Sequence, residues 1–271
     1  FCDDDIRKLQ LLSKAVESGH SISQIASLSQ EELIRVVEDR SFETRYRIDN
    51  GDLAATKTEP YLNESLQCVA ELDINKLQGI LDRAAIDLTR PLLILNVVIP
   101  LLIRTKCLVQ NNNLRPINLK AVTSYLQAFM WGLLRSTTVS ESAPKILTGT
   151  LTGQCSEIAA LAMALIAVES GYKAVHLGSN LAASDLAAAG KSKAAQAVAI
   201  FFEDNKDKCI LGPEIRILQE KLGKDQIVIV CAYKDSDTRK PAKHTGISLT
   251  SLDDFRSVLE TLTTEKMMLQ I

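Results

Sequence analysis

Apolar residues follow two different periods along this chain, and the period changes near residue 143. From residue 61 to 136 they recur every three or four positions, which is typical of amphipathic helices. Helices are predicted at 61–71, 75–87, 91–109 and 118–134. Asp73 is expected to cap the second helix and Pro91 to open the third. The short polar connections between these segments predict an antiparallel four-helix bundle over residues 61–140.

From Ala143 onward, short apolar strands alternate with helices. Strands are predicted in the segments ILTGTL, KAVHLG, AVAIFF, IVIVCA and GISLT, and helices at 156–170, 183–193, 213–222 and 251–265. Continuous apolar runs indicate strands that are buried on both faces, as in a parallel sheet covered by helices. Right-handed crossovers then give a flavodoxin-like, doubly wound five-stranded domain over residues 143–271.

The first 60 residues lack a core of this size. Residues 1–40 contain short helical patterns, with an acidic first turn at Asp3 to Asp5 and a terminating Gly19. Residues 41–60 are polar and contain the breakers Asn50-Gly51 and Pro60, so they are predicted to be a linker.

Composition excludes several classes of protein. The chain has 271 residues, of which 46% are hydrophobic and 24% charged, so it can bury two cores and is not expected to be disordered. A net charge of −2 argues against a globally basic nucleic-acid surface. The longest apolar run, Pro91 to Ile103, is too short to cross a bilayer, and no signal-peptide pattern opens the chain. We therefore predict a cytoplasmic protein without membrane contact.

Cysteines and histidines give no metal signature. The six cysteines stand singly, without a CxxC pair, and are predicted to be reduced packing residues. Cys155 lies at a predicted helix start, where a thiolate would be stabilised, but packing is the preferred interpretation. His176 falls inside a strand and is interpreted as a satisfied interior histidine, whereas His20 and His244 fall in a turn and a polar loop. No metal site is predicted.

A ligand of an open parallel sheet binds outside the carboxyl ends of its strands. The loops at these ends are Thr152 to Ser156, Gly178 to Asn180, Glu203 to Lys206 and Ala232 to Asp237. Gly153 and Gly178 would allow close backbone approach. Trp131, on the last bundle helix, could cover a flat ligand, although a buried core aromatic is the simpler interpretation. The candidate pocket residues are Gly153, Gln154, Cys155, Ser156, Gly178, Ser179 and Trp131.

Catalytic signatures are lacking in the sequence. It contains neither a nucleotide-binding P-loop nor a Ser-His-Asp arrangement, and the chain is not expected to be an enzyme. Ser156 can be explained as the N-cap of its helix, with Glu157 favoured by the helix dipole.

A family resemblance emerges from the order of these segments. The run DDDIRKLQLL…VESGHSISQIASLSQEEL resembles the part of a MerR-type DNA-binding domain that follows the winged helix-turn-helix. The bundle, followed by GQCSEIAAL and VHLGSNL, resembles the cobalamin-binding sensors attached to MerR-type regulators. This resemblance implies an effector-sensing module that forms a dimer or tetramer, in a regulator that binds promoter DNA. The recognition helix and wing would precede Phe1.

The resemblance weakens at the cofactor loop. The family's loop has an acidic residue, any residue, a cobalt-ligating histidine, two residues and a glycine, whereas this chain has Gln154, Cys155 and Ser156 at the first three positions. The family's bundle Trp and Glu-His pair fall near Val109 and Leu119-Lys120. A hydroxyl is a poor cobalt ligand compared with imidazole. No cofactor is therefore expected, and cobalamin is compatible only without an axial histidine.

Two further functions stay open at this point. A corrinoid carrier subunit of a methyltransferase also pairs a helical bundle with this kind of sheet, although Ser156 counts against it. An interaction module that antagonises a full-length regulator by pairing with it is the other alternative.

Overall fold

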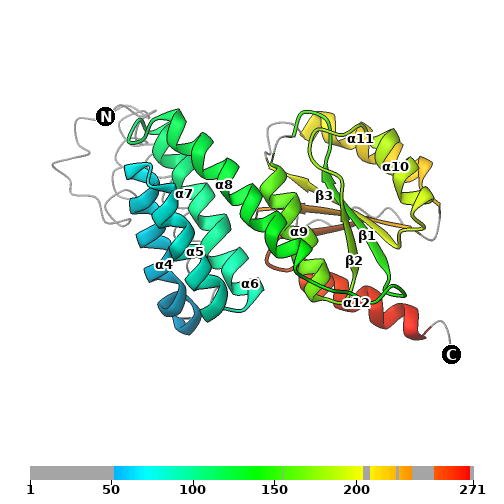
Figure 1. Cartoon of the computed structure of the whole chain (residues 1–271). Coiled ribbons are helices and arrows are strands. Elements are labelled where there is room, and N and C mark those ends of the chain that lie inside the picture. The colour runs from blue at the N-terminus through cyan, green and yellow to red at the C-terminus, as the bar shows by residue number, and fades with distance from the viewer. Residues whose placement is uncertain (1–51, 155, 204–207, 224–225, 234–246, 269–271) are drawn as a thin grey trace, which may run out of the picture. The chain divides into compact units, whose positions relative to one another are not determined.

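Residues 52–154, 156–203, 208–223, 226–233 and 247–268 are described by a computed structural model of the chain (Figure 1). The described residues from Lys57 onward belong to one compact unit. The MerR-like segment 1–40, the first part of the expected linker and Cys155 lie outside the described residues.

The bundle follows the predicted order of helices. It contains α4 (Asp52–Glu71), α5 (Ile74–Asp87), α6 (Arg90–Leu93), the π-helix η1 (Ile94–Val98), α7 (Ile99–Gln110) and α8 (Pro116–Arg135). Asp73 caps α5 as predicted, because its carboxylate accepts a hydrogen bond from the Lys76 backbone N–H at 2.9 Å. Pro91 also lies in the first turn of α6, as predicted.

The linker prediction is wrong for its last residues. Helix α4 begins at Asp52 and continues through Pro60. Thr58, Leu62 and Cys68 are buried on both sides of this proline. The free energy gained by burying these side chains outweighs the backbone hydrogen bond that Pro60 cannot donate. Such tertiary packing cannot be recognised from a proline in the local sequence.

The third predicted helix contains an irregularity that the sequence pattern did not reveal. Helical backbone runs without a break from Arg90 to Gln110, but it widens into η1 immediately before Pro100. Pro100 has no N–H for the carbonyl of Asn96, so a wider turn fits this position. The continuous helical stretch Arg90–Gln110 is long and apolar enough to cross a membrane. The prediction that it could not was based only on the shorter apolar run from Pro91 to Ile103. Half of the most apolar window of Arg90–Gln110 is buried within the unit, as in core helices.

The second domain contains the predicted five-stranded parallel sheet. Its strands are β1 (Lys145–Thr150), β2 (Lys173–His176), β3 (Ala197–Phe202), β4 (Ile227–Ala232) and β5 (Ile247–Ser251). They are ordered β2-β1-β3-β4-β5 and pair in parallel, which confirms the flavodoxin-like topology. The helices are α9 (Glu157–Glu169), α10 (Ala183–Ser192), α11 (Lys208–Lys221) and α12 (Phe255–Met268). The last two helices were predicted to begin at Pro213 and Ser251, and both starts are wrong. Helix α11 begins earlier, at Lys208, and α12 begins later, at Phe255, because Ser251 is the last residue of β5.

Helix α9 connects the two domains. Every residue from Ile158 to Val168 is buried, because the helix packs on β1 and β2 as well as on α8 of the bundle (Figure 1). This explains why its sequence is apolar all round. The other face of the sheet packs against α10 and α11 through a core that includes Leu186, Val198 and Leu218. The start of α9 therefore lies where the bundle meets the carboxyl ends of the strands.

Candidate ligand cleft

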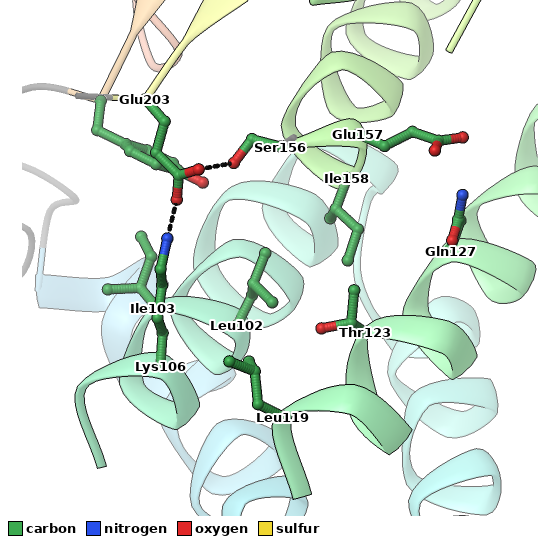
Figure 2. A pocket seen from close by; sticks show the side chains of 11 residues that line it. Leu102, Ile103, Lys106, Leu119, Thr123, Gln127, Ser156, Glu157, Ile158 and Glu203 are labelled. Atoms are coloured by element: carbon green, nitrogen blue, oxygen red, sulfur yellow. Dashed lines mark hydrogen bonds and ion pairs between the residues drawn. The ribbon is translucent and has the colours of Figure 1, made fainter. Parts of the chain in front are cut away.

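A cavity of about 250 Å³ lies between α7, α8 and the carboxyl edge of the sheet (Figure 2). Four aliphatic side chains form its apolar lining, namely Leu102, Ile103, Leu119 and Ile158. The remaining lining side chains are polar or charged and come from the bundle (Lys106, Thr123, Gln127), the start of α9 (Ser156, Glu157) and the strand ends (Glu203, Tyr233).

A hydrogen-bonded group of three residues closes one side of this cleft. The Ser156 hydroxyl donates to Glu203 Oε2 at 2.5 Å, and the Lys106 ammonium forms an ion pair with Glu203 Oε1 (Figure 2). The Glu203 backbone N–H donates to Gln154 Oε1 at 3.0 Å. A single carboxylate thus joins helix α7, the end of β3 and the loop before α9. We refer to Lys106, Glu203 and Ser156 as the cleft bridge.

Ser156 does not act as the side-chain cap that the sequence predicts. It occupies the N-cap position of α9, but its hydroxyl makes no hydrogen bond to the first turn of that helix. The hydroxyl is bonded to Glu203 because that carboxylate is a stronger, charged acceptor within reach.

Tyr233 follows β4 directly and extends this network. Its phenol is hydrogen-bonded to Ser156, and burial, followed by the nearby Glu203 carboxylate, raises the pKa of Tyr233. Its ring packs edge-on against Phe201, with 4.8 Å between ring centroids. Tyr233 therefore remains a neutral hydroxyl at physiological pH.

The predicted glycine loops hold each other in place. Gly153 and Gly178 have φ values of +84° and +99°, which favour glycine. The Gly153 N–H donates to Asn180 Oδ1 at 2.8 Å, and the Thr150 hydroxyl donates to the Gln154 carbonyl at 2.6 Å. These contacts fix the loop that delivers Ser156.

Most of the predicted pocket residues do not line this cavity. Of the seven predicted residues, only Ser156 lines the cavity, and Cys155 lies outside the described residues. The other five do not line it, namely Gly153, Gln154, Gly178, Ser179 and Trp131. Gln154 supports the cleft through its bond to Glu203, and the glycines support it through loop conformation. The predicted pocket and this cavity therefore share Ser156 and the same edge of the sheet.

Trp131 packs against His176 and does not cover the cavity. The two rings meet edge-on, with centroids 5.4 Å apart, and Arg135 lies over the indole at 5.8 Å. Trp131 is half-buried at this contact between α8 and β2. It packs at the contact between α8 and β2, but it is not the fully buried core aromatic that the simpler interpretation expected.

Only one of the two ring nitrogens of His176 has a hydrogen-bond partner among the described residues. Its side chain is fully buried, and Nδ1 lies 3.0 Å from the Thr148 hydroxyl. Nε2 lies 3.7 Å from Glu157 Oε1 and has no hydrogen-bond partner among the described residues. Burial lowers the pKa of His176, and the Glu157 carboxylate opposes this effect only in part. The predicted satisfaction therefore holds for Nδ1 and fails for Nε2.

Two of the described cysteines, Cys68 and Cys231, are free thiols. Cys68 and Cys231 are buried and Cys107 is half-buried. Burial raises the pKa of Cys68 and of Cys231, which keeps both as unreactive thiols. No group of three or more metal-ligating side chains occurs among the described residues.

The residues of this cleft do not fit a histidine-ligated corrin. Among the described residues that line the cleft there is no imidazole, and the hydroxyl at the expected ligand position is already bonded to Glu203. The volume of 250 Å³ lies below the range of about 300–1,000 Å³ typical of small-molecule sites. The cleft in this conformation suits a ligand much smaller than a corrin macrocycle.

Sequence reasoning missed the residues that the bundle contributes. Lys106, Thr123 and Gln127 lie on helices whose facing partner cannot be read from periodicity alone. Glu203 and Tyr233 lie in the strand-end loops that the sequence did identify. Their position directly after β3 and β4 was the available signal.

Comparison with known proteins gives matches to solved structures alone, since no family model and no curated protein matches this chain. A monomethylamine corrinoid protein of Methanosarcina barkeri is 13% identical and has a TM-score of 0.56. It aligns over 75% of this chain and 99% of its own. A cobalamin-binding protein from Desulfitobacterium hafniense is 16% identical, with a TM-score of 0.38, and covers 74% of this chain and 98% of its own. A chain of the methanol:cobalamin methyltransferase complex MtaBC from Methanosarcina barkeri is 11% identical, with a TM-score of 0.41. The alignment covers 90% of this chain and 93% of that chain.

The similarity to the monomethylamine corrinoid protein shows the fold. The chain has the architecture of a cobalamin-binding protein, with a helical bundle followed by a flavodoxin-like sheet. This agrees with the architecture expected from the sequence. At 13% identity it carries no statement about what the cleft of this chain binds.

Proposed function

We propose that the chain is the effector-sensing and oligomerisation part of a MerR-type transcriptional regulator, whose cleft binds a small ligand without a histidine–cobalt bond. The cleft bridge carries this proposal. Ser156 stands where the sensors that the sequence resembles have their ligating histidine, and its hydroxyl donates a hydrogen bond to Glu203, which is in turn paired with Lys106 of the bundle.

The bridge also suggests how ligand binding would be transmitted. Lys106 lies on α7, whereas Glu203 and Ser156 belong to the sheet domain, so a ligand in the cleft contacts both domains at once. A ligand that competes for Glu203 would weaken one of the contacts that hold the bundle on the sheet. Such a change in domain packing can alter the contacts between subunits.

The regulatory part of the proposal is tested with the full-length product of the gene. Size-exclusion chromatography with light scattering is expected to give a dimer or tetramer, and a mobility-shift assay is expected to show binding to DNA upstream of its own gene. A strict monomer that binds no DNA at physiological salt would contradict the proposal.

A corrinoid carrier subunit of a methyltransferase is the second candidate. The observation that favours it is the alignment with 99% of a methylamine corrinoid protein, including both the bundle and the sheet. Ser156 counts against it, because methyl carriers use the axial imidazole to tune cobalt. Turnover of methyl groups from methylcobalamin by the purified chain and a partner methyltransferase would establish this candidate and exclude the first.

A further inference from the structure

We infer that the cleft takes a small organic cation, such as a protonated primary amine on a short apolar chain. This inference rests on the proposed ligand-sensing function and adds the chemical class of the ligand. It follows from the charges, the free acceptors and the shape of the cleft.

Among the described residues that line the cleft, negative charges outnumber positive ones. Two carboxylates, those of Glu157 and Glu203, line it together with one ammonium, that of Lys106. Lys106 is committed to Glu203. Within the described part of the chain, the only ion-pair neighbour of Glu157 is His176, whose pKa is lowered by burial, so the imidazole is neutral. The Glu157 carboxylate therefore has no cationic partner there.

The partly buried position of Glu157 strengthens the attraction of its carboxylate for a cation. Its side chain is 26% exposed, so water screens the carboxylate less than it would on an open surface. The side chain extends along the cavity wall towards Gln127 of α8, away from the cleft bridge (Figure 2). The Gln127 amide makes no hydrogen bond to another described residue. Figure 2 shows this amide with its nitrogen towards Glu157, so the amide must rotate before its oxygen can accept a second N–H of an ammonium bound to Glu157.

The rest of the lining suits an apolar chain. Leu102, Leu119 and Ile158 line the same cavity as the two carboxylates and offer aliphatic contact (Figure 2). The cavity volume of about 250 Å³ lies just below the range of about 300–1,000 Å³ of sites for drug-sized ligands, so the cavity suits a smaller molecule. A short alkylamine has this size.

An anion of the same size meets the opposite conditions. It would approach two carboxylates, and the single ammonium in the lining is already paired with Glu203. The free-energy cost of removing the anion from water would not be offset by electrostatic attraction, because like charges in a partly buried site repel. The charge pattern therefore selects cations over anions and neutral molecules.

The test compares three ligands of equal chain length with the intact chain by isothermal titration calorimetry at pH 7.5. These are n-hexylammonium, 1-hexanol and hexanoate. We expect saturable binding of hexylammonium and at least tenfold weaker binding of the other two. Equal binding of all three, or no binding of hexylammonium, would overturn the inference.

Three variants locate the site. Glu157→Gln keeps the shape and removes the charge, and it should weaken hexylammonium binding at least tenfold. Leu119→Trp fills the cavity without changing its charge and should also abolish binding. Glu220→Gln on the exposed side of α11 is the matched control and should leave affinity unchanged. Unaltered affinity in both Glu157→Gln and Leu119→Trp would overturn the assignment to this cleft.

These results separate the inference from the proposed function. Binding of hexanoate but not hexylammonium, abolished by Leu119→Trp, would sink the cation class and leave the sensing role standing. Tight hexylammonium binding by a full-length protein that is a monomer and ignores DNA would uphold the cation site and sink the regulator.

Discussion

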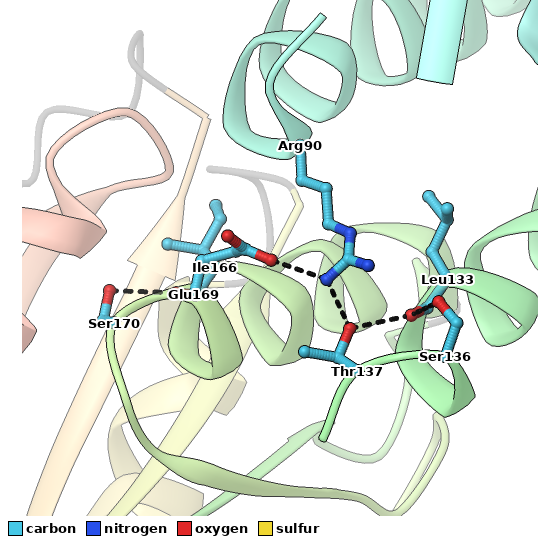
Figure 3. Close-up of polar contacts among 7 residues, drawn as sticks. All are labelled: Arg90, Leu133, Ser136, Thr137, Ile166, Glu169 and Ser170. Carbon is cyan, nitrogen blue, oxygen red and sulfur yellow. Dashed lines mark hydrogen bonds and ion pairs between the residues drawn. The ribbon is translucent and has the colours of Figure 1, made fainter. Parts of the chain in front are cut away.

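Among the residues that the structure describes, two ion pairs join the bundle to the sheet domain, one near each end of α9, and they differ in what surrounds them. At the carboxyl end of α9, Arg90 bonds to Glu169 at 2.7 Å and to the Thr137 hydroxyl at 2.5 Å (Figure 3). At the amino end, Lys106 bonds to Glu203 within the cleft bridge. The carboxylates are similarly exposed, at 31% and 27%.

The difference lies in the cation and the neighbouring space. Arg90 uses a planar guanidinium, and Thr137 is in turn anchored to the Leu133 carbonyl at 3.0 Å (Figure 3). The Lys106 ammonium is a flexible point charge beside the cavity, and 43% of its side chain is exposed. Similar ion-pair chemistry thus serves as an anchor at one end of α9 and as a rearrangeable part of a ligand site at the other.

Replacing the anchor should have the largest effect. Arg90→Ala leaves the Glu169 carboxylate and the Thr137 hydroxyl without their cation. We expect a loss of about 1–2 kcal/mol in the free energy of unfolding, measured by urea denaturation. Arg83→Ala, which removes an ion pair with side chains 62% and 55% exposed, is the control and should cost about 0.5 kcal/mol or less. Equal losses would contradict the anchoring role.

Acidification should act at the His176 contact. Because burial lowers the pKa of His176 below its ordinary value of 6.5, the unfolded chain binds this proton more readily than the folded chain. Stability is therefore expected to fall as the pH drops below about 6.5, by at most about 1.4 kcal/mol per pH unit for this proton.

His176→Gln isolates this contribution. Glutamine cannot be protonated, so the variant should lose less stability than the parent between pH 7.5 and 5.5 in urea unfolding experiments. The groups facing this histidine, Glu157, Thr148 and Trp131, are unchanged in the variant. Identical pH dependence in the two proteins would show that the imidazole is not the group concerned.

Replacing the lysine of the cleft bridge should affect binding more than stability. Lys106→Met keeps the aliphatic stem and removes the charge, so we expect a stability loss of about 1 kcal/mol or less. The cleft then has two carboxylates and no ammonium, and hexylammonium should bind several-fold more tightly in calorimetry. Arg90→Ala should leave that affinity unchanged. Weaker binding in Lys106→Met would contradict the expected repulsion between the Lys106 charge and the ligand cation.

The smallest expected effect concerns the serine itself. Ser156→His restores an imidazole at the loop position, but Lys106 and Glu203 still close the cleft. We expect no cobalamin in the absorption spectrum of the desalted variant. Retention of cobalamin by Ser156→His, but not by the parent, would show that the serine alone excludes the cofactor.

Much of the fold could be read from the sequence because its periodicity is strong. The apolar runs of β1, β3 and β4 predicted a parallel sheet, whereas the positive φ of Gly153 and Gly178 was not predicted. Pro60 misled the linker prediction, since burial on both sides of it is a tertiary effect. Local pattern contains no information on such packing.

The cleft was only half predictable for a related reason. Strand-end loops locate the edge of the sheet, and they contain Ser156, Glu203 and Tyr233. Which bundle helix lies over that edge depends on packing between domains, so Lys106 and Gln127 carry no signal in the sequence. The role of Ser156 as donor to Glu203 also depends on a residue far away along the chain.

The most direct test of the account is an absorption spectrum. The intact chain is incubated in the dark with adenosylcobalamin or hydroxocobalamin and then desalted. We predict that no corrin absorption remains with the protein, because Ser156, Glu203 and Lys106 occupy the position that a ligating imidazole would need. A retained stoichiometric corrin spectrum, with cobalt bound to a protein nitrogen, would contradict it.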